Sequence, residues 1–315
     1  MGFPDGVEVV RLPKLPERHY TVDFWVPPFN AKAVVAVLPH LQALKVVQSL
    51  MAGVDWLLPC LPAGLTVCDG RGIHDVPTSE WVLAAILSSL KQFPRYRDNQ
   101  KAGQWRGQVA FGGGFRAHEE KEEAAKAQSL QAGQMIVLSD ELFGKTVLIV
   151  GYGSVGAAIE ARLRAFDAKV LRVARNAREG VSSIADLPEL LPLADVVVLI
   201  VPLTQSTRAM FGAELMARMK PGALLVNAAR GPVVVTDDLD AALREGRIHA
   251  AVDVTDPEPL PPGHPLWSAP NCLITPHIGG STAAFIGRAY ALVARQLHHY
   301  VRGEPLENVV GDAGY

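Results

Sequence analysis

The sequence predicts an α/β protein with two doubly wound parallel sheets, and three observations lead to this class. The chain has 315 residues, which exceeds one typical domain and suits two. Apolar runs of strand length alternate with segments whose apolar residues have helical spacing. One run, Val147 to Val150, passes directly into a glycine-rich turn. Runs that are apolar throughout are typical of parallel strands that helices cover on both faces.

The expected strands are nine runs rich in apolar residues, with helical patterns between them. They are Glu8 to Leu12, Ala33 to Leu38, Val46 to Leu50, Val147 to Val150, Val170 to Val173, Val196 to Ile200, Ala223 to Asn227, Ala250 to Val254 and Cys272 to Thr275. Their distribution along the chain predicts one sheet in the first part and a second in the middle.

Two longer helices are expected where the chain passes between the domains. A capping signal at Thr78 opens an apolar helix through Leu90, and a second helical run extends from Ser281 to Val301. The second helix returns the chain to the first domain. We therefore expect a discontinuous domain of residues 1–78 and 288–315, with residues 79–287 inserted as the other domain.

The glycine-rich turn predicts a dinucleotide-binding site. Gly151, Gly153 and Gly156 lie between the apolar strand and a segment with helical spacing, which is the context of a Rossmann-like fingerprint. The first glycine permits the turn, the second admits a pyrophosphate, and the third allows helix and strand to pack closely. The phosphates then bind N–H groups at the helix N-terminus. The alternative is an ordinary glycine turn in an α/β unit.

The end of the next strand favours NADP(H) over NAD(H). NAD-binding sites carry a carboxylate about 20 residues beyond the glycines, where it binds the ribose hydroxyls. Here Ala174 occupies that position and Arg175 follows it, with Arg178 close behind. An arginine can pair with a 2′-phosphate. The alternative is that both arginines are solvated surface charges.

Composition excludes several classes of partner. The net charge of −2, with both signs interspersed, leaves no basic stripe for nucleic acid or for an anionic membrane. The longest apolar stretch, Val196 to Val201, is far too short to span a bilayer. No secretory signal is visible at the N-terminus, so we expect a cytoplasmic protein. Cys60, Cys68 and Cys272 lack metal-type spacing, and we expect reduced thiols and no metal.

The segment Gln104 to Ser139 stands apart from the α/β pattern. Its glycines, Gly112 to Gly114, lack the lysine that a phosphate loop requires, so a second nucleotide site is not expected. A charged stretch and an alanine-rich stretch follow these glycines. We expect a flexible loop and an exposed helix here.

Three ionisable residues follow expected strands and therefore face the carboxyl edge of the sheet, where α/β proteins bind ligands. Arg230 follows the strand that ends at Asn227, Glu258 lies in a proline-rich loop, and His277 precedes two glycines. Each has an ordinary alternative, as an ion-pair partner or a turn residue. Together they supply a carboxylate clamp, a group that favours protonated histidine, and a proton donor. These are the groups needed to reduce a 2-keto acid by hydride transfer.

With these residues in place, the chain resembles the D-isomer-specific 2-hydroxyacid dehydrogenase family, which includes glyoxylate/hydroxypyruvate reductases and phosphoglycerate dehydrogenases. The resemblance covers nearly the whole chain. The motifs that carry it are Ala52 to Asp55, Gly151 to Gly156, Val201 to Thr204 with Thr207, Asn227 to Gly231, Asp253 to Pro259 and Pro276 to Gly280.

The resemblance implies a role for each matching residue. Arg230 binds the substrate carboxylate and keto oxygen, His277 is the acid/base, and Glu258 tunes His277. Ala52 and Gly53 offer backbone N–H groups to the carboxylate. In the expected cofactor site, Asp253 holds the nicotinamide carboxamide. The other residues of this site are Gly151, Gly153, Ser154, Val155, Gly156, Arg175, Pro202, Thr207, Ala228 and Gly279.

The resemblance also implies a homodimer and a small substrate such as glyoxylate or hydroxypyruvate. Two alternatives remain open. A phosphoglycerate dehydrogenase would need a basic residue near the substrate, for which Arg71 is a candidate. A non-catalytic dinucleotide-sensing regulator would retain much of the same site while binding a protein partner.

Overall fold

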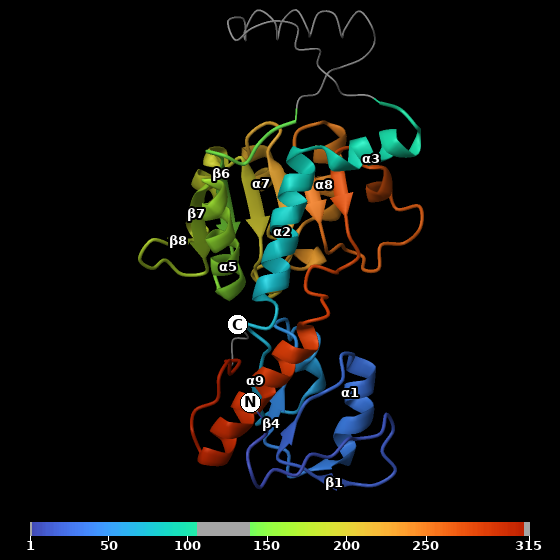
Figure 1. The fold of residues 1–315 in the computed structure, drawn as a ribbon, viewed down its shortest axis with the longest axis vertical. Coiled ribbons are helices and arrows are strands. Elements are labelled where there is room, and N and C mark those ends of the chain that lie inside the picture. The colour runs from blue at the N-terminus through green and yellow to red at the C-terminus, as the bar shows by residue number, and fades with distance from the viewer. Residues whose placement is uncertain (1, 106–138, 312–315) are drawn as a thin grey trace, which may run out of the picture.

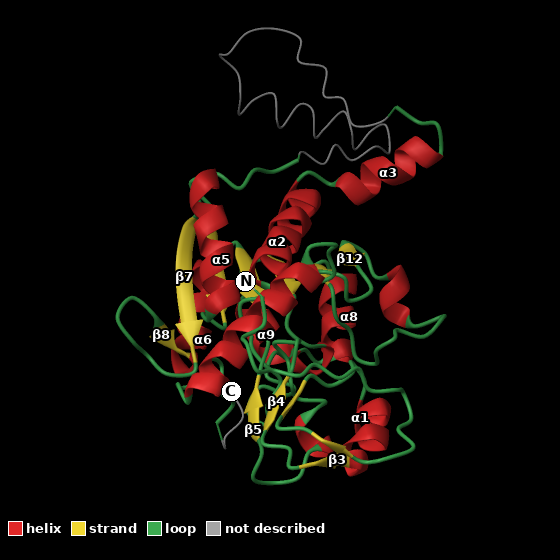
Figure 2. Ribbon diagram, turned by 60° about the horizontal axis from the view of Figure 1, so that its bottom comes forward, coloured by secondary structure: helices red, strands yellow, loops and turns green. Residues whose placement is uncertain are grey.

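The computed structural model describes residues 2–105 and 139–311, which form two lobes joined by helix α2, Asp75–Leu90 (Figure 1). The large lobe contains the long sheet, and the small lobe contains the N-terminal strands together with the C-terminal helix (Figures 1 and 2). Nearly all of the segment Gln104 to Ser139, with its expected loop and helix, lies outside the described residues.

The large lobe is built on a parallel sheet of seven strands, in the order β12-β11-β10-β9-β6-β7-β8. The strands are β6 (Thr146–Val150), β7 (Lys169–Ala174), β8 (Ser182–Ser183), β9 (Val196–Leu199), β10 (Leu224–Asn227), β11 (His249–Val252) and β12 (Cys272–Ile274). The strand order reverses at β6, because β7 and β9 flank it on opposite sides. Six of the expected strands are confirmed here, and the α/β class is confirmed with them.

Helices cover both faces of this sheet because its strands are apolar on both sides. On β6, Val147 and Ile149 face α2 and α5, whereas Leu148 and Val150 face the opposite layer. All four side chains are fully buried. The helices of this lobe are α2, α3 (Phe93–Lys101), α5 (Ser154–Leu163), α6 (Leu187–Leu190), α7 (Ala213–Arg218) and α8 (Thr236–Arg244).

The described part of the small lobe has short parallel strands and two α-helices. Its elements are β1 (Tyr20–Thr21), β2 (Phe24–Trp25), α1 (Ala31–Val37), β3 (Leu41–Gln42), β4 (Val46–Gln48), β5 (Thr66–Cys68) and α9 (Phe285–Arg302). Strands β2, β4 and β5 pair in that order, and β1 pairs with β3. A separate core that includes Trp25, Val34 and Val47 fills the lobe.

A buried amide pair attaches α9 to the small lobe. Nε2 of Gln296 donates to Oε1 of Gln48 at 2.7 Å and to the carbonyl of Glu307 at 2.8 Å. Gln48 and Gln296 have no exposed surface. Since buried amides are costly without partners, this network fixes where the chain returns after the large lobe.

Two expected strands in the small lobe are wrong. Most of the run from Ala33 to Leu38 lies in helix α1, which Oδ1 of Asn30 caps by accepting the N–H of Ala33 at 2.8 Å. Val34 and Val37 are buried at helical spacing while Val35 is exposed. Glu8 to Leu12 pairs with no strand among the described residues, and its valines are exposed.

The two long helices begin at different residues from those expected. Helix α2 starts at Asp75, so Thr78 lies in its first turn instead of capping it. Helix α9 starts at Phe285, because the N–H of Ser281 closes a turn onto the carbonyl of Ile278. No helix in the described part of the chain is both long enough and apolar enough to cross a membrane.

Candidate active site

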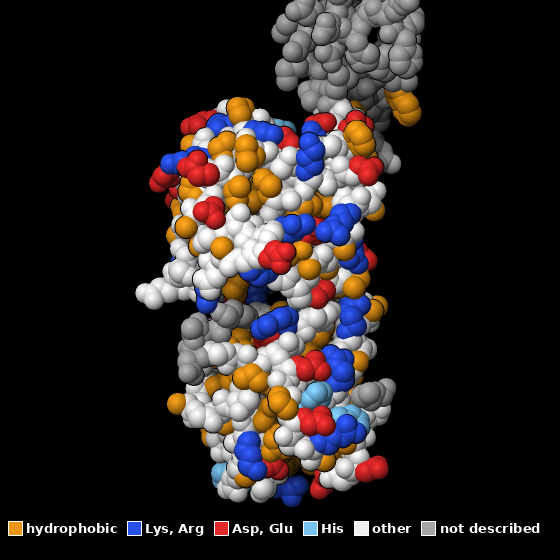
Figure 3. Space-filling model, turned by 90° about the vertical axis from the view of Figure 1, so that its left-hand side faces the viewer, with side chains coloured by type: hydrophobic (Ala, Val, Ile, Leu, Met, Phe, Trp, Pro, Cys, Tyr) orange, Lys and Arg blue, Asp and Glu red, His pale blue; other side chains and the backbone are white. Residues whose placement is uncertain are grey.

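A cleft of about 720 Å³ lies between the lobes, and both contribute side chains to it. Figure 3 shows a hollow between the two bodies with Lys and Arg side chains around it. Most of the expected site residues line this cleft, namely Ala52, Gly53, Gly151, Gly153, Ser154, Val155, Arg175, Pro202, Thr207, Ala228, Arg230, Asp253 and His277. Gly156, Glu258 and Gly279 do not line it.

Close contacts require two of the three motif glycines, and the third borders the cleft. Gly151 has φ +109°, and a Cβ there would lie 2.6 Å from the backbone of Ile200 on the neighbouring strand. A Cβ on Gly156 would lie 2.9 Å from the carbonyl oxygen of Gly151, so this residue serves the packing of helix on strand. A Cβ on Gly153 would meet no described atom within 4 Å, because this glycine borders the cleft.

The N-terminus of α5 opens into the cleft beside Gly153. No side chain among the described residues caps this helix, so its first N–H groups are available to an anion. Oγ of Ser154 donates to Oδ1 of Asp75 at 3.0 Å, which ties the start of α5 to the start of α2. Backbone donors, a glycine at the approach and a helix N-terminus together fit a pyrophosphate.

Positively charged side chains surround the end of β7. Arg175 and Arg178 line the cleft beside Ala174, and no carboxylate stands in that position. Arg178 lies over the ring of Tyr152, 5.8 Å from its centroid, and donates to the carbonyl of the same residue. Arg175 is exposed and makes no side-chain hydrogen bond or ion pair with other described residues. This end of the cleft can accept an additional phosphate.

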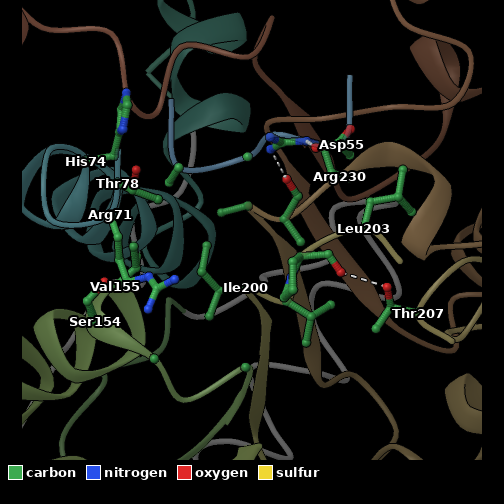
Figure 4. A pocket seen from close by; sticks show the side chains of 18 of the residues that line it. Asp55, Arg71, His74, Thr78, Ser154, Val155, Ile200, Leu203, Thr207 and Arg230 are labelled. Carbon is green, nitrogen blue, oxygen red and sulfur yellow. Dashed lines mark hydrogen bonds and ion pairs between the residues drawn. The ribbon is translucent and has the colours of Figure 1, made fainter. Parts of the chain in front are cut away.

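The loop after β9 forms the opposite wall of the cofactor region. Oγ1 of Thr207 donates to the carbonyl of Pro202 at 2.7 Å and accepts the N–H of Thr204 at 2.8 Å (Figure 4). These bonds hold the loop closed on itself, so Pro202 and Thr207 have fixed positions at the cleft. Ala228 lines the cleft just after β10, where its N–H donates to the carbonyl of Leu199.

The loop that carries Arg230 is fixed by buried contacts. Oδ1 of Asn227 accepts the N–H of Ala229 at 3.1 Å, and Nδ2 of Asn227 donates to the carbonyl of Arg230 at 3.2 Å. A Cβ on Gly231 would lie 1.8 Å from the carbonyl oxygen of Thr255, so glycine allows the two strand-end loops to touch. The guanidinium of Arg230 then projects into the cleft (Figure 4).

His277 and Glu258 form a direct pair at the cleft. Nδ1 of His277 lies 2.7 Å from Oε1 of Glu258, and both side chains are 41% exposed. His277 has φ +54°, a left-handed conformation that is unusual for a residue with a side chain. Its N–H donates to the carbonyl of Asp253 at 2.7 Å, which holds the backbone in that conformation. Glu258 thus touches the cleft only through its contact with His277 among the described residues.

Asp253 organises the His277 loop from beneath. Its Oδ1 accepts the hydroxyl of Thr275 at 2.6 Å and the N–H of Ile278 at 2.9 Å, and its Oδ2 accepts the N–H of Gly279 at 2.7 Å. Each carboxylate oxygen can accept two hydrogen bonds, so Oδ2 retains one acceptor position. The buried carboxylate lines the cleft and can take one further donor, such as an amide N–H.

Asp55 and His74 of the small lobe also line the cleft, although neither is among the expected site residues. Asp55 lies within a recognised motif, and Nε of Arg230 donates to its Oδ1 at 3.3 Å. His74 precedes α2, and its ring packs at a tilt against Phe285, with 5.2 Å between the ring centroids. Burial, aided by the charge of Arg288, lowers the pKa of His74 to about 4, so this imidazole is neutral at physiological pH. Only its position just before the long helix could have indicated His74.

Comparison with known proteins identifies a matching family and several similar reductases. Residues 83–279 match the family described as D-isomer specific 2-hydroxyacid dehydrogenase, NAD binding domain. A glyoxylate reductase of Thermofilum pendens is 42% identical over 171 residues, which are 52% of this chain and 50% of that protein. A glyoxylate reductase of Pyrococcus furiosus is 30% identical over 299 residues, which are 92% of this chain and 83% of that protein.

A solved structure is similar over both lobes. The NADPH-dependent glyoxylate/hydroxypyruvate reductase from Sinorhizobium meliloti, in complex with NADP and sulfate, has a TM-score of 0.77 at 30% identity, covering 95% of this chain and 88% of that one. With some curated relatives, the alignment spans only 50% to 59% of the relative's length. The match to residues 83–279 covers more than half of the chain, and the chain therefore belongs to the D-isomer-specific 2-hydroxyacid dehydrogenase family.

Proposed function

We propose that this protein is an NADP(H)-dependent reductase that converts a small 2-keto acid, such as glyoxylate or hydroxypyruvate, into the D-2-hydroxy acid. The observation that carries the proposal is the convergence of Arg230, the His277–Glu258 pair and the glycine turn on one cleft. Reductases of glyoxylate are among the relatives of the chain, which supports this substrate class.

The cofactor region fits a nicotinamide dinucleotide. The uncapped start of α5 would bind the pyrophosphate, and the remaining acceptor position on Asp253 would bind the carboxamide. When bound, the nicotinamide supplies the hydride. Pro202, Thr207 and Ala228 also line the cleft and would keep the rings in place.

Arg230 would bind the substrate carboxylate and polarise its keto group. Its guanidinium lies against Gly53, so a substrate held on this fork also contacts the backbone of the small lobe. A planar guanidinium matches a carboxylate in two parallel hydrogen bonds. This contact fixes the keto carbon between the lobes, where the reacting groups meet.

His277 would donate the proton to the keto oxygen. Because Nδ1 contacts Glu258, Nε2 is the nitrogen left to face the substrate. A carboxylate beside Nδ1 holds its proton and orients the ring, so Nε2 can give up its proton as the hydride arrives. His74 is neutral at physiological pH and packed against Phe285, which makes it a poor candidate for this step.

The preference for NADP(H) depends on the end of β7. Arg175 and Arg178 would pair with the 2′-phosphate, and Ala174 supplies no carboxylate to bind the unmodified ribose. The similar structure from Sinorhizobium meliloti holds NADP, which supports this assignment.

Initial rates of NADPH and NADH oxidation test the proposal. The purified protein is assayed with glyoxylate, hydroxypyruvate, pyruvate and 3-phosphohydroxypyruvate, each at saturating cofactor. We expect the highest kcat/KM with NADPH and an unphosphorylated keto acid. The absence of turnover with any of these acids, despite dinucleotide binding, would favour the regulator instead.

One observation supports phosphoglycerate dehydrogenase as a second candidate. Arg71 lines the cleft, and its Nη2 lies 2.9 Å from Oδ2 of the buried Asp69, which holds this cation near the substrate. A 3-phosphohydroxypyruvate rate above that of the unphosphorylated acids would support this candidate.

We also propose a homodimer, as the family resemblance implies. Large aromatic side chains of the large lobe are exposed, with Phe93 at 59%, Phe143 at 68% and Trp105 at 87%, and burial of such surface favours association. Sedimentation equilibrium should give twice the mass of the chain, and a monomer at micromolar concentration would contradict the proposal.

A further inference from the structure

The guanidinium of Arg230 is held from both lobes. Its Nε donates to Oδ1 of Asp55, in the small lobe, at 3.3 Å. Its Nη1 donates to the carbonyl of Ala229, in the large lobe, at 2.8 Å. A Cβ placed on Gly53 would lie only 1.5 Å from Nη2, so this glycine leaves the space that the guanidinium occupies. Figure 4 shows Asp55 and Arg230 pointing toward each other.

These contacts determine which hydrogen atoms of Arg230 remain for a ligand. A guanidinium has five N–H donors. Asp55 takes the one on Nε, and Ala229 takes one of the two on Nη1. Among contacts with the described residues, the other N–H of Nη1 and both N–H groups of Nη2 are unused. The terminal edge of the guanidinium carries one of these N–H groups from each nitrogen. That edge is a fork with the geometry of a carboxylate.

Asp55 is placed to set the direction of this fork. The side chains of Asp55 and Arg230 are only 24% and 26% exposed, so the pair is partly shielded from solvent. Oδ1 of Asp55 would also lie 3.1 Å from a Cβ on Gly53, which places its carboxylate beside the same surface. Partly exposed ion pairs contribute little to the free energy of folding. A long arginine side chain has many rotamers, so the main effect of this pair is to restrict the orientation of Arg230.

We propose that Asp55 is a positioning residue, which orients Arg230 across the cleft so that its terminal fork meets the substrate carboxylate. The pair also joins the lobes at the point where the substrate binds, so the carboxylate site is complete only when Asp55 and Arg230 are together. This inference rests on the proposed reduction of a 2-keto acid.

The test compares Asp55→Ala and Asp55→Glu with wild type. The readouts are the KM for glyoxylate, the inhibition constant of oxamate, and the Kd for NADPH from its fluorescence. Oxamate is an unreactive probe with the same carboxylate. Asp23→Ala is the matched control, because Asp23 pairs with Lys45 at 2.8 Å in the same lobe but does not line the cleft.

We expect Asp55→Ala to raise both the KM for glyoxylate and the inhibition constant of oxamate about tenfold or more. An effect of this size corresponds to the loss of one charge-assisted hydrogen bond. The Kd for NADPH should stay within about twofold, because Asp55 does not contact the dinucleotide region. Asp55→Glu should recover part of the loss, and Asp23→Ala should match wild type. An Asp55→Ala variant with a wild-type KM would overturn the inference.

A double-mutant cycle separates positioning from a structural role. If Asp55 acts through Arg230, then Asp55→Ala adds little to the defect of Arg230→Lys. Full additivity of the two defects would overturn the inference, since the residues would then act independently. A wild-type protein that neither reduces a 2-keto acid nor binds oxamate would overturn the proposed function, and this inference with it.

Discussion

Nδ1 of His277 lies 2.7 Å from Oε1 of Glu258, although the two residues belong to loops that follow different strands. The loop after β11 carries Glu258, and the loop after β12 carries His277. Because β11 and β12 are parallel neighbours, both loops leave the same edge of the sheet. The parallel topology therefore assembles the pair.

Glu258→Gln should lower kcat about 10- to 10³-fold, because an amide cannot hold the proton of Nδ1 as a carboxylate does. The KM for NADPH should change little, since Glu258 does not line the cleft. Glu304→Gln is the control, because Glu304 lies 3.6 Å from Nδ1 of His299, far along α9. A wild-type kcat in Glu258→Gln would show that the pair is structural.

Arg175→Ala should raise the KM for NADPH about tenfold or more and leave that for NADH within about twofold, since only NADPH carries the 2′-phosphate. The measurement is the ratio of kcat/KM values for the two cofactors. Arg208→Ala is the control, because Arg208 is exposed and does not line the cleft. Equal effects of Arg175→Ala on both cofactors would contradict its assignment to the phosphate.

Gly53→Ala should reduce kcat/KM for the keto acid about 100-fold or more, because its Cβ would displace the guanidinium of Arg230 from the cleft. Gly287→Ala is the matched control, since a Cβ there meets no described atom and the residue lies in α9. The control should keep full activity and raise the free energy of unfolding by about 0.5–1 kcal/mol. Equal activity of the two variants would exclude the proposed contact.

The pH dependence of stability should reflect Glu160. Hydrogen bonds from Arg172 lower the pKa of this carboxyl to about 2 from 4.5, and its side chain is only 3% exposed. A folded-state pKa below the unfolded value adds stability above pH 4.5, and this stability is lost as the pH falls towards 2.

Urea unfolding between pH 5 and pH 3 measures this contribution. Glu160→Gln should unfold more easily at pH 7 and show a smaller loss of stability on acidification than wild type. Glu179→Gln, which changes an exposed carboxylate, should follow the wild-type curve. Identical pH dependence in Glu160→Gln and wild type would contradict this account.

The large lobe could be predicted from the sequence better than the small lobe. Strands such as β6 and β9 are buried on both faces, so continuous apolar runs mark them. The strands of the small lobe have two or three residues, too few for a pattern to appear. At Ala33 to Leu38, the β-branched valines favour a strand by their intrinsic propensity. The Asn30 cap and the helical spacing of Val34 and Val37 outweigh that propensity.

The site residues of the large lobe could likewise be predicted better than those of the small lobe. Arg230, Glu258 and His277 follow strands of the long sheet, so their placement at one edge could be inferred from topology. Asp55 and His74 enter the cleft from the small lobe, and only the packing of one lobe on the other brings them there. A sequence pattern does not encode that relation.

Turnover of glyoxylate by His277→Ala, at saturating NADPH, tests the central claim most directly. We expect kcat to fall about 10²–10⁴-fold, because the variant lacks the imidazole that would donate the proton, while the Kd for NADPH stays unchanged. His298→Ala, on α9 and outside the cleft lining, should retain full activity. A His277→Ala protein that binds NADPH and reduces glyoxylate at the wild-type rate would contradict the account.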